Sequence, residues 1–463
     1  MKNKKLIGVL IGPVLFLLCF LLPDTMFSDK GRIAVATVVW MSAWWITMPV
    51  SPAVTAFLPI AVNALFSVCP MADIIKQYAA ELVILLLGAN MITISWEKTG
   101  LDKRLALRAL NLIGPSVRQQ MVVWLLISTV MSSILPNAVV VAVLTPIAVS
   151  MLRYIGYGEI DKHKSSSLIL LAIAWGANNG GMASPLGGSM NLVALESIEN
   201  FLGHEFIYAD WVVKMLPFTL AITVLSCLFI FFQKAEVKTL EGSKEYFRNL
   251  QKSQPPMTRA ELISLILFLT AVVISFTREL YASILPDLKP AYAFLICGLL
   301  TFIISADGKP LLTWKESEKS IMWEMIYIFA GGTALGTLVN NSGAAKEIAS
   351  LLTGSGIGNG FLTIFIVVAF IIILSDVVNN VSAAAISIPI IIALAQALNY
   401  DVIAFTMIGC AAYNVSYTLP TSIRAVPVGY GLKPDFMMKR GIGLSVLVII
   451  AVSVIGWITL GCP

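Results

Sequence analysis

An internal repeat constrains the fold of this chain more than any other feature of its sequence. The segment beginning at Glu81 (ELVILLLG) matches the segment beginning at Glu324 (EMIYIFAG), 243 residues later. Agreement at one offset over roughly 65 residues, without a gap, indicates two similar halves. The same offset relates four further pairs, namely Gly88 and Gly331, Gly100 and Gly343, Asn137 and Asn380, and Pro146 and Pro389.

The two halves are too apolar to fold in water. Of the 463 residues, 58% are hydrophobic and only 12% are charged, whereas a soluble domain carries roughly 25% charged residues. Apolar stretches of about 20 residues, enough helix to cross the hydrocarbon core, recur along the chain. We therefore predict an all-α polytopic membrane protein with the lipid bilayer as its solvent. The net charge of +5 needs no nucleic-acid partner to account for it.

We expect about eleven transmembrane helices and two re-entrant hairpins. With five spans in each repeat, an odd number, the second repeat is inserted upside down relative to the first. Inverted repeats that meet near the midplane are the architecture of alternating-access carriers. The expected parts are a first transmembrane helix (1–31), a first repeat (32–232, with a hairpin at 119–151 and a broken helix at 166–195), a cytoplasmic linker (233–258) and a second repeat (259–463, with a hairpin at 360–396 and a broken helix at 402–430).

The distribution of basic residues predicts the orientation. With the N-terminus inside, the inner segments hold 23 of the 31 Lys and Arg residues, which obeys the positive-inside rule. The C-terminus then lies outside, in a bacterial-type inner membrane. Met1–Lys5 followed by Leu6–Leu22 could also be a signal peptide. We favour a membrane helix because no small-x-small cleavage site follows.

The sequence argues against an enzyme and against a bound cofactor. Its six cysteines are scattered without a CxxC pair, and it has only two histidines, which argues against a zinc site or a disulfide framework. No HExxH or GxSxG motif is present. Oxygen-rich breaks within apolar segments leave Na⁺ as a possible coupling ion.

Each hairpin is interrupted by polar residues near its middle. The first tip runs Ser132-Ser133-Ile134-Leu135-Pro136-Asn137-Ala138, and the second runs Ser375-Asp376-Val377-Val378-Asn379-Asn380-Val381. A helix N-terminus there would present free N–H groups and a positive dipole end to an anion. An Asn amide can donate to a carboxylate or give its oxygen to a cation. The alternative is an asparagine that only packs helices; the matched positions favour a site.

The spans after the hairpins are broken by Gly and Pro. One contains the run Asn178–Asn191 and the other the run Asn414–Pro427. This density of Gly and Pro interrupts a helix, and the freed carbonyl groups can hold Na⁺. The alternative is that the glycines only allow close helix contacts.

These features resemble the divalent anion:sodium symporter family, the INDY-type dicarboxylate carriers, over nearly the whole chain. Further matching cues are the run Trp96–Arg104 (WEKTGLDKR), the Gly180–Asn191 loop and the run Gly431–Phe436 (GLKPDF) before the last span. The resemblance implies a homodimer in which a transport domain carrying both hairpins moves against a scaffold domain. It also implies a small divalent organic anion, such as malate, succinate or tartrate, as the substrate.

The family's site residues carry over only in part. The tips keep both Asn but lack the flanking hydroxyls, and the broken spans lack the usual Thr-Pro-Pro. By resemblance, a first Na⁺ site involves Ser132, Asn137, Gly187 and Asn191, and a doubtful second site involves Ser375 and Asn380. The residues expected to bind the substrate are Asn137, Ala138, Asn379, Asn380, Val381 and Arg424.

Arg424 lies within a predicted span, at the place where the resemblance implies the second sodium site. An Arg at mid-helix costs about 2.5–3.5 kcal/mol on insertion scales, so it should face a cavity or a partner. We hypothesise that its fixed charge substitutes for the ion and pairs with a substrate carboxylate. Alternatives are a structural pair with Asp376 or snorkelling toward the cytoplasm.

Two other kinds of carrier stay open. One transports an inorganic oxyanion such as sulfate, and the other exchanges sodium for protons. A proton-coupled antiporter needs a carboxylate near each broken helix, and Asp376, whose counterpart Ser133 is neutral, is the single candidate that we identify. Whether a dicarboxylate carrier would be a sodium symporter or an anion exchanger is left open by the sequence.

Overall fold

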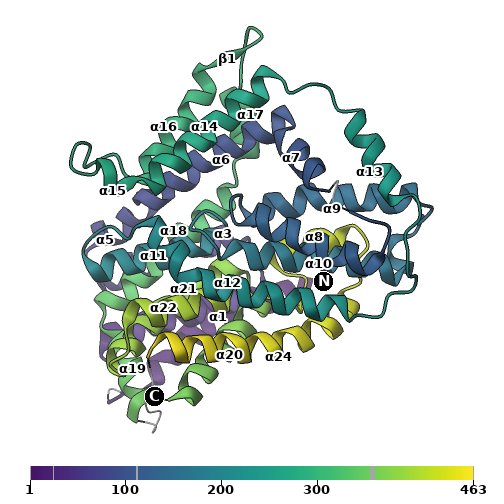
Figure 1. The fold of residues 1–463 in the computed structure, drawn as a ribbon. Helices are drawn as coiled ribbons and strands as arrows, with labels where there is room; N and C mark the ends of the chain where they lie inside the picture. The colour runs from purple at the N-terminus through teal and green to yellow at the C-terminus, as the bar shows by residue number, and fades with distance from the viewer. Residues whose placement is uncertain (1, 24, 111–112, 355–359, 462–463) are drawn as a thin grey trace.

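The computed structural model describes residues 2–23, 25–110, 113–354 and 360–461. Met1, the last two residues and the few other positions outside these ranges, which belong to the predicted first helix and the two repeats, lie outside the description. The described chain is almost entirely helical (Figure 1). Its one sheet is a two-residue pair, β1 (Ser305–Ala306) antiparallel to β2 (Lys309–Pro310). The prediction of an all-α polytopic membrane protein is confirmed.

The first half is a succession of helices joined by turns and short loops. The predicted broken helix is two helices, α10 and α11, separated by an unwound loop, and the predicted hairpin is α8 and α9. The bounds are α1 (Lys2–Leu18), α2 (Asp29–Thr47), α3 (Pro52–Thr55), α4 (Leu58–Phe66), α5 (Met71–Lys76), α6 (Glu81–Thr99), α7 (Leu101–Leu110), α8 (Val117–Ser132), α9 (Asn137–Tyr154), α10 (Lys164–Gly181), α11 (Ser189–Leu202) and α12 (Tyr208–Phe231).

The second half has corresponding elements. α21 begins at Asn380, 243 residues after α9 begins at Asn137, so the helix starts follow the sequence offset. The inverted relation of the two halves stays a prediction. The bounds are α13 (Ser243–Lys252), α14 (Arg259–Phe276), α15 (Arg278–Tyr281), α16 (Pro290–Ile303), α17 (Trp314–Ser320), α18 (Trp323–Asn341), α19 (Ala344–Gly354), α20 (Phe361–Val377), α21 (Asn380–Ala397), α22 (Val402–Asn414), α23 (Ala425–Gly429) and α24 (Pro434–Thr459).

Length and hydropathy alone identify fewer spans than the sequence reading expects. Among the described residues, six helices are long and apolar enough to cross a membrane, or seven if α17 and α18, bent by 60° at their junction, form one span. Several other predicted spans are apolar helices of 10–17 residues, because breaks and short turns divide them. The count of about eleven spans stays a prediction.

The helices pack in two neighbouring groups (Figure 1). In one group, α6, α14 and α16 contact one another at the end that carries the strand pair. The other contains both helix pairs of the predicted hairpins, the broken helices and α12 and α24. A Cβ atom on Gly88 of α6 would lie 2.5 Å from the backbone nitrogen of Leu295, so only glycine permits the close contact of α6 with α16.

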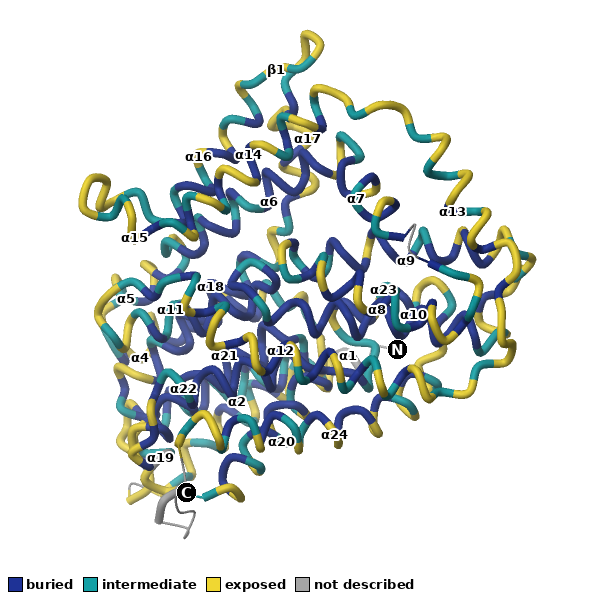
Figure 2. The backbone as a smooth tube through the Cα atoms, viewed as in Figure 1, coloured by how far each residue is buried: buried dark blue, intermediate teal, exposed yellow. Residues whose placement is uncertain are grey.

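The distribution of buried and exposed residues is that of a membrane protein (Figure 2). α10, α21 and α22 are buried along nearly their whole length, although they contain many Ser and Asn residues. α20 and α24 expose regularly spaced large apolar side chains, such as Ile366, Phe370 and Ile450. Apolar side chains facing outward and polar side chains inside are the distribution that lipid favours.

The predicted linker at 233–258 contains a docked helix. α13 occupies Ser243–Lys252, and the chain before it runs against the start of α8, where the Leu240 N–H donates to the Pro115 carbonyl (2.7 Å). After α13, the guanidinium of Arg104 in α7 binds the Pro255 carbonyl (2.9 Å) and Glu261 (2.7 Å). The linker therefore joins the halves through specific contacts with α7 and α8.

Candidate functional site

Two helix N-termini, deep in the buried part of the structure, mark the candidate site. α8 ends at Ser132 and α9 begins at Asn137, while α20 ends at Val377 and α21 begins at Asn380. Pro136 precedes α9, and the Asn379 side chain caps α21 by accepting from the Ser382 N–H (2.8 Å). These residues end one helix and start the next, which is why each apolar segment breaks where it does.

A serine in each pair ties the break to the following broken helix. The Ser132 hydroxyl donates to the Ala177 carbonyl in α10 (2.8 Å), and the Ser375 hydroxyl donates to the Tyr413 carbonyl in α22 (2.6 Å). Both serines are fully buried. The matched bonds give the two halves the same local construction, and each hydroxyl oxygen keeps lone pairs that could face a cation.

Asn137 has the most available side chain of the predicted residues. Its backbone N–H donates to the Gly187 carbonyl (3.0 Å), but within the described residues its amide makes no hydrogen bond. The amide lies beside Gly181, since a Cβ atom there would be 3.3 Å from Asn137 Nδ2. Ala138 and Val381 occupy the first turns of α9 and α21, where backbone N–H groups have no helical acceptor.

Asn414, which we did not single out from the sequence, joins the two halves. Its Nδ2 donates to Asn191 Oδ1 (2.8 Å), and its carbonyl accepts from Asn380 Nδ2 (3.5 Å). Asn191 Nδ2 in turn donates to the Gly181 and Ser184 carbonyls (2.7 and 2.8 Å) and holds the unwound loop together. Gly187 and Asn191 thus lie in one buried network with the Asn137 and Asn380 tips.

The Asn414 side-chain oxygen has no partner. It is buried and accepts no hydrogen bond within the described residues. It faces Gly181 and Gly188, where added Cβ atoms would lie 3.6 and 3.7 Å away. A buried acceptor without a donor costs about 1–3 kcal/mol, so it calls for a ligand. Amide and carbonyl oxygens together fit a hard cation such as Na⁺.

A second set of contacts crosses between the broken helices. Asn178 Nδ2 donates to the Ser416 carbonyl (2.6 Å), and the Tyr417 hydroxyl donates to Asn179 Oδ1 (2.6 Å). The Ser416 hydroxyl donates to Asn380 Oδ1 (3.2 Å). Both Asn380 amide atoms therefore bind the second unwound segment, which orients this side chain more firmly than that of Asn137.

Arg424 is fully buried, and its partners are all protein groups. Its Nε donates to the Leu419 carbonyl (2.6 Å), and Nη1 binds both the carbonyl (3.2 Å) and the hydroxyl of Ser416. Nη2 binds the Thr421 hydroxyl and the Ser375 carbonyl (3.5 Å), with Asp376 at 3.9 Å. The guanidinium thus makes five hydrogen bonds with carbonyl and hydroxyl groups in this conformation, and its distance to Asp376 is longer. Both readings of Arg424, a pair with Asp376 or with a substrate carboxylate, stay predictions.

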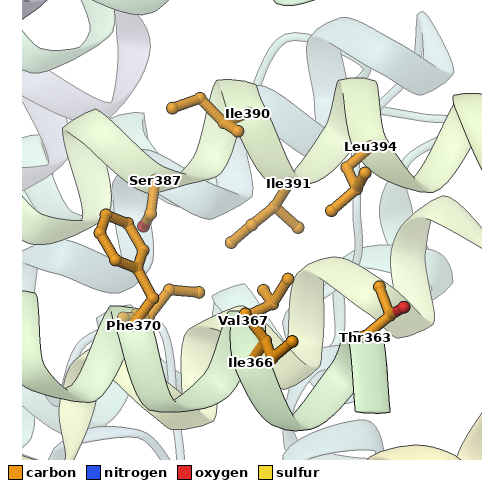
Figure 3. Close-up of a pocket in the computed structure, with 9 residues that line it drawn as sticks. Thr363, Ile366, Val367, Phe370, Ser387, Ile390, Ile391 and Leu394 are labelled. Atoms are coloured by element: carbon orange, nitrogen blue, oxygen red, sulfur yellow. The ribbon is translucent and has the colours of Figure 1, made fainter. Parts of the chain in front are cut away.

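The adjoining cavities are small or apolar. A space of about 30 Å³ beside the first break is lined by Pro136, Pro185, Leu186 and Ser189 and has room for about two waters. A larger groove of about 350 Å³ between α20 and α21 is lined by side chains such as Ile366, Phe370 and Ile391 (Figure 3). Its apolar lining suits lipid or a packed helix and not a carboxylate.

A buried polar network between broken helices, inside an apolar helical shell, is the arrangement of a membrane transporter. The solved structure of the Alcanivorax borkumensis YdaH transporter has a similar fold, with a TM-score of 0.51 and 14% identity over 87% of this chain and 89% of that one. The fold is thus that of a multi-pass helical membrane protein. A family model described as "Citrate transporter" matches residues 42–409. The chain belongs to this family, which consists of transporters and not of enzymes.

Curated relatives match nearly the entire chain. The sodium-dependent dicarboxylate transporter SdcS of Staphylococcus saprophyticus is 25% identical over 472 residues, covering 97% of this chain and 90% of the relative. The protein of the same name from Staphylococcus aureus is 24% identical over 476 residues, covering 98% and 90%. The resemblance to the divalent anion:sodium symporters, inferred from the tips and loops, is confirmed.

Proposed function

We propose that this protein imports small dicarboxylates across the bacterial inner membrane in symport with Na⁺. Its relatives are named sodium-dependent dicarboxylate transporters, and the candidate site offers both kinds of ligand group. The Asn137 amide and the N-termini of α9 and α21 suit carboxylates. The observation that supports a Na⁺ site is the buried, unpartnered Asn414 side-chain oxygen beside Gly181 and Gly188.

The groups that would hold Na⁺ come from both halves. Asn414 Oδ1 from the second half and nearby carbonyl groups from the first, such as those of Ser132 and Gly187, are the oxygen ligands that a hard cation prefers. Bound there, Na⁺ would place a positive charge next to the Asn137 tip. The dianion would then bind more tightly with the ion than without it, which is the basis of coupling.

Arg424 takes the place of a second cation in this proposal. Its guanidinium binds the carbonyls of Ser375, Ser416 and Leu419, all freed by the break before α21 and the unwinding after α22. A fixed positive charge in that position removes the need for an ion there. Direct pairing of Arg424 with a substrate carboxylate would require it to release one of these acceptors.

Transport by alternating access follows from the same architecture. We infer that α8–α12 and α20–α24 move as a unit, elevator-like, against the group that contains α6, α14 and α16, and that the protein is a homodimer. Anion exchange without Na⁺ and transport of an inorganic oxyanion are the competing functions.

Uptake into proteoliposomes tests the proposal. Purified protein should accumulate radiolabelled succinate, malate or tartrate under an inward Na⁺ gradient, and much less with choline in place of Na⁺. Citrate and sulfate distinguish substrate classes, and liposomes preloaded with unlabelled succinate test for exchange. Equal uptake with and without Na⁺, or uptake of sulfate alone, would show that the proposed function is wrong.

A further inference from the structure

Two cavities meet at the C-terminal end of α11, on the face predicted to lie outside. One, of about 230 Å³, lies between α11, α18, α19 and α21 and includes Lys346 and Gln396. The other, of about 430 Å³, lies between α11, α12, α6 and the N-terminus of α16. Glu196 and Asn200 line both cavities, so we treat them as one space and call it the outer vestibule.

The outer vestibule contains carboxylates that are shielded from solvent. Glu196 and Glu199 are only partly exposed, and Glu196 Oε2 is buried without a hydrogen-bond partner among the described residues. Tyr208 also lines the vestibule and is 3% exposed, and its hydroxyl has no partner within the described residues. Two residues of the cavity wall with unpartnered buried polar groups indicate that the vestibule binds a ligand.

Neighbouring charges come from every element around Glu196. Lys289 binds Glu81 (2.8 Å), and Arg278 binds Glu205 (3.0 Å), so these four groups are largely occupied with one another. The titratable and charged groups that face the vestibule are Glu199 on the same helix, His204, Glu205 and Tyr208 after it, Lys76 on α5, Glu81 on α6, Lys289 before α16 and Lys346 on α19.

Glu196 and Glu199 are therefore the groups of the vestibule whose charge can change with pH. Both lie beyond the predicted span at 166–195. Burial, followed by the charge of Glu199, raises the pKa of Glu196 to about 8. Burial also raises the pKa of Glu199 to about 7, although the Phe206 N–H lowers it in part. Both carboxyls consequently change charge near neutral pH, from protonated at lower pH to ionised at higher pH.

We propose that the outer vestibule is a proton-gated entrance that captures the external dianion when Glu196 and Glu199 carry protons. Apart from the Lys289–Glu81 and Arg278–Glu205 ion pairs, Glu196 and Glu199 stand against Lys76 and Lys346, which gives a net charge of 0 with both carboxyls ionised and +2 with both protonated. The vestibule therefore becomes positive as pH falls. This inference rests on the proposed function, because it takes the substrate to be a dianion.

The expected effect follows from Coulomb's law. One unit charge about 8 Å from a dianion in a water-filled cavity changes the occupancy of the dianion about fivefold at low salt, and about twofold at physiological ionic strength. The KM for external succinate should therefore rise several-fold between about pH 6.5 and about pH 8.5, a range in which these carboxyls ionise. The rise should shrink as salt is added.

The test compares a double variant, Glu196→Gln with Glu199→Gln, with wild type and with a matched control. Gln has the shape of the protonated acid, so the KM of the double variant should be low and independent of external pH. Glu318→Gln removes the same charge from an exposed position on the predicted inner face and should keep the wild-type pH profile. The internal pH is held constant throughout.

A second measurement reports protonation without transport. A carboxyl with a raised folded-state pKa releases its proton less readily when folded, so stability falls as pH rises through that value. The melting temperature of wild type should decline from about pH 6.5 to about pH 8.5, and that of the double variant should decline less. A wild-type KM that does not vary with pH, or a double variant with the wild-type dependence of KM on pH, would contradict the proton-gated entrance and leave the proposed function standing. A protein that takes up no dicarboxylate would overturn the proposed function as well.

Discussion

Replacing Arg424 by Ala should destabilise this protein more than any surface substitution. The guanidinium is fully buried, and each of its five N–H groups has an acceptor in the Ser375, Ser416, Leu419 and Thr421 segment. Alanine removes one donor from each of three carbonyls and two hydroxyls, of which the Ser416 carbonyl keeps its hydrogen bond from Asn178. It also leaves Asp376, which lies 3.9 Å from Nη2, without its nearest positive charge.

The size of the loss can be bounded from comparable sites. Removing one partner of a buried ionic network costs about 3–5 kcal/mol, less than the sum of its separate hydrogen bonds. For large domains each kcal/mol corresponds to about 2 °C in melting temperature, so we expect a drop of about 6–10 °C. The melting temperature of Arg424→Lys should lie between those of wild type and Arg424→Ala, because a single ammonium group cannot reach all of these acceptors.

The assay is thermal unfolding of the detergent-purified protein in choline chloride and in sodium chloride. If the guanidinium stands in for a cation, Na⁺ can enter the vacated oxygens of Arg424→Ala and recover part of the lost stability, whereas choline cannot. Arg108→Ala, an exposed position on α7, is the control for loss of one charge. If Arg424→Ala melts at the wild-type temperature, the Arg424 network does not stabilise the protein as we argue. If its melting temperature falls and Na⁺ does not raise it again, Arg424 does not take the place of a bound cation.

Three further predictions concern the packing and the site. Gly88→Ala should lower stability by about 1–3 kcal/mol through overpacking against α16, while Gly429→Ala, which meets open space, should be neutral; thermal unfolding compares them. Arg104→Met should cost about 3–5 kcal/mol because it leaves the buried Glu261 carboxylate unpaired, and limited proteolysis should detect release of the linker. Asn191→Ala should weaken the apparent affinity for Na⁺ about tenfold or more, since the loop carbonyls lose a donor worth about 1.5 kcal/mol; uptake against Na⁺ concentration measures it.

The helix breaks could be predicted from sequence because they depend on local chemistry. A cluster of polar residues in the middle of an apolar run favours a helix break, so Asn137 and Asn380 were recognisable as helix starts. A single proline is not enough, since Pro146 and Pro389 lie inside α9 and α21. These signals need no knowledge of the rest of the chain.

The partners across the site could not be predicted, because they join residues far apart. The Asn178 amide binds a carbonyl 238 residues later, and Asn414 binds Asn191 at a separation of 223. Neither spacing leaves a periodic trace in the sequence. The partial burial of Glu196 could not be predicted for a similar reason, since the helices that cover it lie far away in the sequence.

The two halves close their unwound segments with different donors, and this difference bears on coupling. In the first half a neutral amide, Asn191, donates to two loop carbonyls, and the nearby Asn414 oxygen is left without a donor. In the second half Arg424 donates to the Ser375, Ser416 and Leu419 carbonyls and brings a full positive charge.

A cation is attracted to unsatisfied oxygens and repelled by a neighbouring guanidinium, so the oxygens around the Asn191 loop and Asn414 should bind Na⁺, whereas those around Arg424 should not. A carrier with one such site would import a dianion with a single Na⁺ and move one net negative charge inward. Uptake should then be slowed by an inside-negative potential. A carrier that filled both halves with Na⁺ would be electroneutral, and uptake unaffected by the potential would contradict the asymmetry.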